Sequence, residues 1–96
     1  MIIAEVSITP LGIGTSVSKY VREAVKVIHN SGLKVETGGM STTIEAPDLD
    51  TLFQVIKRAE EAEIQAGAKR ISIYLKIDDR RDKEATIEKK IKSALG

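Results

Sequence analysis

Carboxylate and hydroxyl side chains recur at alternate positions in segments that otherwise contain apolar residues. Glu5, Glu36, Thr43 and Glu45 follow this pattern, so the alternation predicts that their side chains share one face of a sheet. Carboxylates accept hydrogen bonds, whereas hydroxyls both donate and accept them. Two interpretations remain open. Either this face is solvated or packed against another subunit, or part of it lines a small-molecule pocket at a subunit junction.

The chain contains no group of residues typical of an enzyme. No nucleophile, base and orienting residue form a recognisable set, and no two carboxylates have the spacing of a general acid and base. His29 is the only histidine and is expected to face solvent near a helix end, with no obvious metal or nucleophile partner. Asp78, Asp79 and Asp82 match no calcium loop, so a salt-bridged turn is favoured, with Asp82 capping the last helix. We predict no catalysis, no metal and no cofactor.

Residues 12–18 form a small loop, Gly-Ile-Gly-Thr-Ser-Val-Ser, between an expected strand and an expected helix. A phosphate group can bind at such a helix N-terminus. The loop is neither a complete G-x-G-x-x-G motif nor a P-loop. The alternative is ordinary turn geometry, in which Thr15 or Ser16 caps the helix. Met40 follows two glycines and is expected either in a subunit interface or as an apolar wall of a pocket.

The composition is that of one small domain spanning residues 1–96. Its 15 basic and 14 acidic residues give a net charge of +1, which offers no electrostatic case for nucleic-acid binding. The absence of cysteine excludes disulfides and thiolate chemistry and favours a cytoplasmic protein. No apolar run approaches the ~20 residues that span a bilayer, and the N-terminus does not resemble a signal peptide. Few Asn and Gln residues beside many charged ones give a thermophile-like composition.

The expected elements follow the order β-α-β-β-α-β with one more helix at the C-terminus. We expect strands at 2–9, 33–37, 41–46 and 70–78, and helices at 17–28, 49–66 and 83–95. This order predicts an α+β sandwich of the ferredoxin-like type, with a four-stranded antiparallel sheet and the helices on one face. The first and third strands are central, and the edge strands can pair with another chain.

The two faces of this sheet differ in character. The face toward the helices is expected to be apolar and to carry Ile2, Ala4, Val6, Ile8, Val35, Ile44, Ile71, Ile73, Leu75 and Ile77. The central strands offer the other face polar side chains and no aromatic ring, so stacking of RNA bases is not expected. On the second helix, Glu60, Glu61 and Glu63 are expected to form a solvated face with Lys57 and Arg58.

Short stretches along nearly the whole chain together resemble the small thiamine-binding protein family. They are Pro10-Leu11-Gly12, Thr15 to Val21, Ser31-Gly32-Leu33, Gly39 to Glu45 and Lys76 to Arg80. The resemblance implies a ferredoxin-like fold and dimers that join their sheets, often paired into tetramers. It also implies binding of thiamine or its hydroxymethylpyrimidine moiety, without known catalysis. The family's Met-Gly-Thr-x-x-Glu-Gly stretch corresponds to residues 40–46, where Ser41 and Ala46 replace its glycines.

The resemblance and the chemistry of an aminopyrimidine suggest a set of ligand-binding residues. They are Leu11, Ser16, Ser18, Met40, Thr42, Thr43 and Glu45. Glu45, Thr43 and Ser18 can supply hydrogen bonds to the amino group and a ring nitrogen. Met40 and Leu11 can supply apolar walls.

The expected partners are a small molecule and further copies of the chain, with no nucleic acid and no membrane. The chain is expected to form a homodimer or homotetramer through its sheet edges and its open sheet face. Two alternative functions remain. One is a regulatory ligand-sensing module acting on a partner enzyme, and the other is a small enzyme on a dimeric α/β-barrel.

Overall fold

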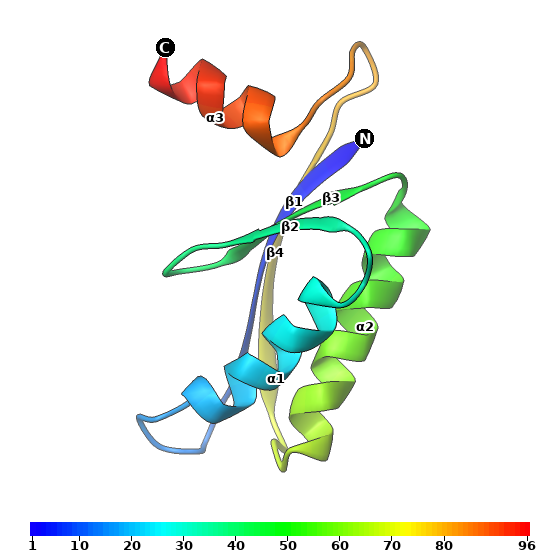
Figure 1. The fold of residues 1–96 in the computed structure, drawn as a ribbon. Helices are drawn as coiled ribbons and strands as arrows, with labels where there is room; N and C mark the ends of the chain where they lie inside the picture. Colours follow the sequence, from blue (N-terminus) through cyan, green and yellow to red (C-terminus); the bar gives the residue numbers. More distant parts are fainter.

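A computed structural model describes residues 1–96 and contains the expected elements in the expected order (Figure 1). They are β1 (Ile2–Pro10), α1 (Ser18–His29), β2 (Lys34–Thr37), β3 (Thr42–Ala46), α2 (Leu49–Gln65), β4 (Ile71–Asp79) and α3 (Ile87–Leu95). The strands form one antiparallel sheet in the order β2-β3-β1-β4. The predicted α+β fold class is confirmed, and β1 and β3 are the central strands.

The main core lies between one face of the sheet and the helices α1 and α2. It is built from the alternate residues of β1 and β3 and the inner stripes of both helices: Ile2, Ala4, Val6, Ile8, Ala24, Ile28, Ile44, Ala46, Leu52, Val55, Ile56 and Ala59. The two helices lie mainly over β1, β2 and β3. Edge strand β4 is therefore less covered, and Ile73 on its helix-side face remains 40% exposed.

The predicted N-caps of helices α1 and α3 are both wrong. Helix α1 starts after Val17 with no side-chain cap, so neither Thr15 nor Ser16 has that role. Helix α3 is capped by Thr86, whose Oγ1 accepts a hydrogen bond from the backbone N–H of Lys89. Residues 80–86 form the loop that connects β4 to α3, which lies on the sheet face opposite α1 and α2. As a result, α3 begins later than predicted.

Asp48 caps α2, because its Oδ1 accepts a hydrogen bond from the Thr51 backbone N–H over 2.8 Å. The backbone and hydroxyl of Thr51 hold the pKa of this carboxyl below its ordinary value. We expect Asp48→Ala to lower the Tm by about 4 °C at pH 7, since an N-cap is lost. Asp50→Ala is the control, because Asp50 lies in the first turn without capping it. Thermal melts followed by circular dichroism that gave both variants the same Tm would contradict this role of Asp48.

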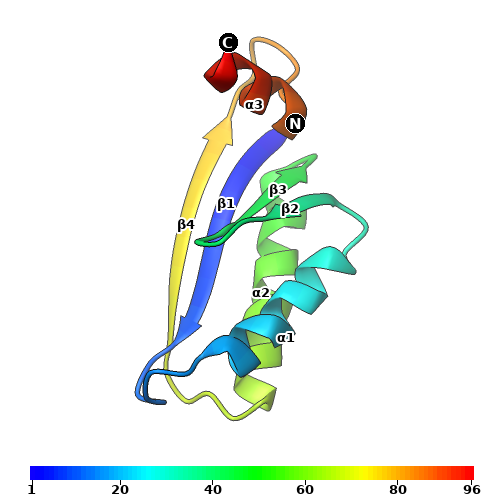
Figure 2. The same cartoon turned by 60° about the vertical axis from the view of Figure 1, so that its left-hand side comes forward.

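The expectation that all helices lie on one face of the sheet is wrong for α3. This helix packs on the face that α1 and α2 leave open, near the chain's N-terminus (Figure 2). A second small apolar cluster forms there from Ile3, Ala85 and Ile87, all of them buried. The sheet is therefore covered on both faces at this end and on one face elsewhere.

Glu63 also departs from prediction, because it belongs to the buried stripe of α2 and not to a solvated face. Its position follows Leu52, Val55 and Ala59 at helical spacing, and its side chain has no exposed surface. Neither carboxylate oxygen has a hydrogen-bond partner. Burial, and secondarily the charge of Glu60, raises the pKa of Glu63 to about 7. Here helical spacing is a better guide to burial than residue type.

Candidate functional site

The register of the sheet places four residues in one row across its open face. Asp78 of β4 lies beside Ile3 of β1, which pairs with Glu45 of β3, which in turn pairs with Lys34 of β2. These side chains point to the same face because they stand opposite one another in antiparallel strands. We call these four residues the anchor row.

Helix α3 contacts every member of the anchor row. Ile87 packs against Ile3 in the small cluster, and the backbone N–H of Ile87 donates a 2.5 Å hydrogen bond to Glu45 Oε1. Lys90 Nζ lies 2.5 Å from Asp78 Oδ2, and Glu88 forms an ion pair with the row's lysine. The hydrogen bond and charge of Lys90 hold the pKa of Asp78 below its ordinary value. The anchor row is thus the docking site of α3.

The next row on the same face is not covered by α3. It consists of Lys76, Glu5, Thr43 and Glu36, which again come from four neighbouring strands. We call these residues the floor row. They present two carboxylates, one ammonium group and one hydroxyl to a surface that no other element crosses.

A groove of about 540 Å³ lies between α3 and the β2–β3 hairpin. The helix and the hairpin extend from the sheet on the same side (Figure 1). The floor of the groove consists of Glu36 and Thr43 from the floor row and of Ile3 from the anchor row. One wall is the hairpin, with Thr37, Gly38, Gly39, Met40 and Ser41. The other wall is α3, with Ile87, Lys90, Ile91 and Ala94. An adjoining hollow of about 430 Å³ lies over β1 and β4 and shares Ile3, Thr43 and Lys90 with the groove.

Hydrogen bonds from both faces of the sheet hold the β2–β3 hairpin. On the open face, Ser41 Oγ donates to Glu5 Oε2 over 2.9 Å. On the helix side, the Thr37 and Thr42 hydroxyls lie 3.2 Å apart, and His29 Nε2 lies 2.7 Å from Thr37 Oγ1. His29 is therefore exposed as predicted, and the fold places the hydroxyl of Thr37 beside its ring.

Only part of the predicted ligand-binding set lies at this groove. Met40 and Thr43 line it, with Met40 at the hairpin tip and 90% exposed. Glu45 lies one row away, buried beneath α3. Thr42 points to the opposite face, where it pairs with Thr37 and is buried.

The other predicted residues follow the C-terminal end of β1 in the sequence, and Figure 2 shows this end of the strand pointing away from α3. Leu11 follows that end and donates its backbone N–H to the Arg70 carbonyl over 2.8 Å. Ser16 lies in the loop that follows, and Ser18 is the first residue of α1. None of the three lines any of the five main cavities. Within one chain, the predicted set is divided between the two ends of the sheet, and its contact with a ligand stays a prediction.

Sequence reasoning assigned Glu36 to the correct face but did not include it in the binding set. Alternation is a sufficient signal for its face, while the pairing of β2 with β3 is needed to place it beside Thr43. Ile91 and Ala94 belong to the apolar stripe that the sequence shows on the last helix. Only the docking of α3 reveals that this stripe faces a groove.

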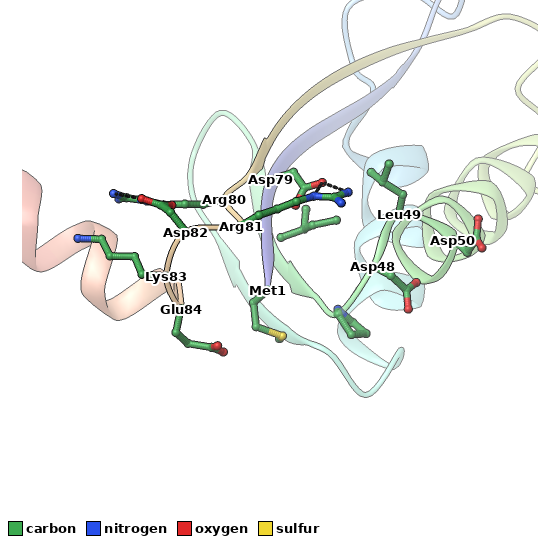
Figure 3. Close-up of a pocket in the computed structure, with 12 residues that line it drawn as sticks. Met1, Asp48, Leu49, Asp50, Asp79, Arg80, Arg81, Asp82, Lys83 and Glu84 are labelled. Carbon is green, nitrogen blue, oxygen red and sulfur yellow. Dashed lines mark hydrogen bonds and ion pairs between the residues drawn. The ribbon is translucent and has the colours of Figure 1, made fainter.

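A further hollow of about 570 Å³ lies beside the start of α2 (Figure 3). Four of its charged groups form two ion pairs, in which Arg80 Nε lies 2.7 Å from Asp82 and Arg81 lies 3.0 Å from Asp79. The salt-bridged turn expected here is present, although Asp82 does not cap α3. No group of three or more His, Cys, Asp or Glu side chains is arranged to hold a metal ion. None of the helices combines the length and apolar character needed to cross a membrane.

Comparison with known proteins identifies the family. The family model described as thiamine-binding protein matches residues 4–95. The chain belongs to the thiamine-binding protein family. A UPF0045 protein of Methanothermobacter thermautotrophicus is 45% identical over 94 residues, which are 97% of this chain and 95% of the relative. YqgV of Bacillus subtilis, also a UPF0045 protein, is 42% identical over 98 residues, and the match covers 97% of this chain and 93% of the relative.

Solved structures agree with the fold of this thiamine-binding family member. A hypothetical protein from Methanocaldococcus jannaschii has a TM-score of 0.89 and 47% identity, with 98% of this chain and 95% of that chain covered. A Thermotoga maritima protein, assigned provisionally to thiamine biosynthesis or salvage, has a TM-score of 0.82 at 24% identity, with 97% of each chain covered. At that identity the likeness concerns the fold alone. Membership of the family indicates a small-molecule-binding protein.

Proposed function

We propose that this protein binds thiamine or its hydroxymethylpyrimidine moiety in the groove between α3 and the β2–β3 hairpin, without catalysis. The observation that carries the proposal is the combination of a polar floor with apolar walls in this groove. Glu36 and Thr43 lie on the floor, whereas Met40 and Ile91 stand on opposite walls. Small-molecule sites commonly combine apolar walls with a few aimed polar groups.

The polar groups of the floor suit an aminopyrimidine. The Glu36 carboxylate forms no ion pair in the structure and can accept a hydrogen bond from an exocyclic amino group. The Thr43 hydroxyl can donate to a ring nitrogen. The carboxylates of Glu5 and Glu36 also favour the positive charge of a thiazolium ring. Met40 is unbranched and flexible, which allows it to pack against the face of a flat ligand.

We propose that the protein acts in the cytoplasm as a homo-oligomer. Strand β4 has nine residues and pairs only with β1, so its outer edge offers unpaired backbone groups. Ile73 and Tyr74 on its two faces are partly or largely exposed. A second copy pairing along this edge would cover them, and a copy on the open face would close the groove. Native mass spectrometry is expected to report a dimer or tetramer, and a monomer alone would contradict the assembly.

Glu36→Gln is expected to weaken thiamine binding about tenfold, because a hydrogen bond to a charged acceptor is replaced by a neutral one. Isothermal titration calorimetry with thiamine and with hydroxymethylpyrimidine measures the change. Glu61→Gln is the matched control, because it makes the same change at an exposed glutamate of α2 that lines none of the five main cavities, and it is expected to leave the Kd unchanged. The absence of binding to wild-type protein, or equal binding by Glu36→Gln and Glu61→Gln, would rule out this role of the groove.

A further inference from the structure

Glu45 is buried at 7% exposure and lines none of the five main cavities. Its carboxylate is instead occupied by α3, since Oε1 accepts the backbone N–H of Ile87 over 2.5 Å. The first N–H groups of a helix have no partner within the helix, and the helix dipole favours a negative charge there. A carboxylate acceptor also makes such a hydrogen bond stronger than a neutral one. Glu45 thus adds a cap to α3 from a distant strand, beside the local cap at Thr86.

The other attachments of α3 are weaker. Its ion pairs, Lys90 with Asp78 and Glu88 with Lys34, join side chains that are 45–71% exposed to solvent. Exposed ion pairs of this kind contribute little to stability. The buried apolar contact is confined to the first residue of the helix, Ile87, while Leu95 at the other end is 83% exposed. Most of the helix beyond its first turn therefore has little to hold it against the sheet.

The position of α3 decides the shape of the groove. The helix supplies four of the twelve lining residues, namely Ile87, Lys90, Ile91 and Ala94. If α3 left the anchor row, the groove would lose one wall, and Ile3 on its floor would be exposed to water. A ligand that contacts this wall must therefore bind more tightly when α3 is docked.

We infer that Glu45 is a positioning residue for the groove, which sets ligand affinity by holding α3 in place without contacting the ligand. This inference rests on the proposed function, in which the ligand occupies the groove. It differs from a direct role, in which Glu45 accepts a hydrogen bond from the ligand's amino group. The two roles give different results for the free protein, because only a positioning role affects α3 when no ligand is present.

The test compares wild type, Glu45→Ala and Glu45→Gln by amide hydrogen exchange of α3, first without ligand. In Glu45→Ala the α3 amides are expected to exchange about tenfold faster, while the amides of β1 and β3 keep their wild-type rates. Glu45→Gln is expected to lie between the two, because its amide oxygen can still accept the Ile87 N–H. Glu88→Gln, which removes only an exposed ion pair of the same helix, serves as the control and is expected to change little.

Calorimetry with thiamine completes the test. The Kd is expected to rise about tenfold in Glu45→Ala and less in Glu45→Gln, in the same order as the exchange rates. Wild-type exchange of α3 in Glu45→Ala would overturn the inference, as would faster exchange with an unchanged Kd. If wild-type protein takes up no thiamine, the proposed function fails. The exchange rates then decide by themselves whether Glu45 holds α3.

Discussion

Replacing Glu63 with methionine is expected to raise the free energy of unfolding by about 2 kcal/mol at pH 8, since the substitution removes an unsatisfied buried carboxyl. The side chain is fully buried, and neither oxygen has a hydrogen-bond partner. Methionine has a similar volume and fills irregular space well, so the packing of α2 is retained. Urea unfolding of the two proteins at the same pH measures the difference.

The pH dependence of this difference follows from the raised pKa of Glu63, about 7 in the folded protein against an ordinary value of 4.5. Between these values the folded protein keeps a proton that the unfolded chain has lost. Wild-type stability due to this group is therefore present below pH 4.5 and decreases as the pH rises to about 7. The advantage of Glu63→Met should accordingly be large at pH 8 and small at pH 5.

Two further variants separate charge from polarity. Glu63→Gln removes the charge but leaves an amide without partners, so a smaller gain than with methionine is expected. Glu61→Gln changes an exposed glutamate of the same helix and is expected to leave the stability nearly unchanged. If Glu63→Met were no more stable than Glu61→Gln at pH 8, the conclusion that the buried, unpaired carboxylate of Glu63 destabilises the folded protein would be wrong.

Ile44→Ala is expected to lower the free energy of unfolding of the whole domain by about 2–5 kcal/mol. Ile44 is fully buried on central strand β3 and packs within the main core cluster. A domain of this size has only a modest stability to lose, so the variant is expected to be largely unfolded in mild denaturant. Denaturation followed by circular dichroism gives the measurement.

Ile87→Ala provides the matched comparison, because the same kind of apolar contact is lost from the small cluster under α3. That cluster is separate from the main core and contains only Ile3, Ala85 and Ile87. We expect α3 to open locally while the main unfolding transition shifts much less than in Ile44→Ala. Equal shifts of that transition in the two variants would show that α3 and the rest of the domain unfold as one unit.

The relation between α3 and the sheet connects stability with function in this protein. The helix rests on the anchor row, while the neighbouring floor row stays open and carries Glu5, Thr43 and Glu36. Substitutions in the anchor row are thus expected to act on the groove through the helix. Substitutions in the floor row are expected to act on the ligand directly.

The sequence by itself determined the order of the elements, the central and edge strands and the faces of most strand residues. These properties depend on local periodicity and on the chirality of crossover connections, both of which can be read along the chain. The short stretches between Pro10 and Arg80 also indicated the family, which the match over residues 4–95 confirms. The same alternation assigned Glu5 and Glu36 to the open face.

Only the tertiary structure decided where α3 docks, and with it the surroundings of Glu45. Its docking depends on matching Ile87, Glu88 and Lys90 with residues from all four strands, and such long-range matches have no periodic signature. Glu63 fits the helical period of the buried stripe, but because it is charged it was predicted to be exposed. The division of the predicted binding residues between the two ends of β1 likewise follows from the antiparallel register, which is a property of paired strands and not of any one segment.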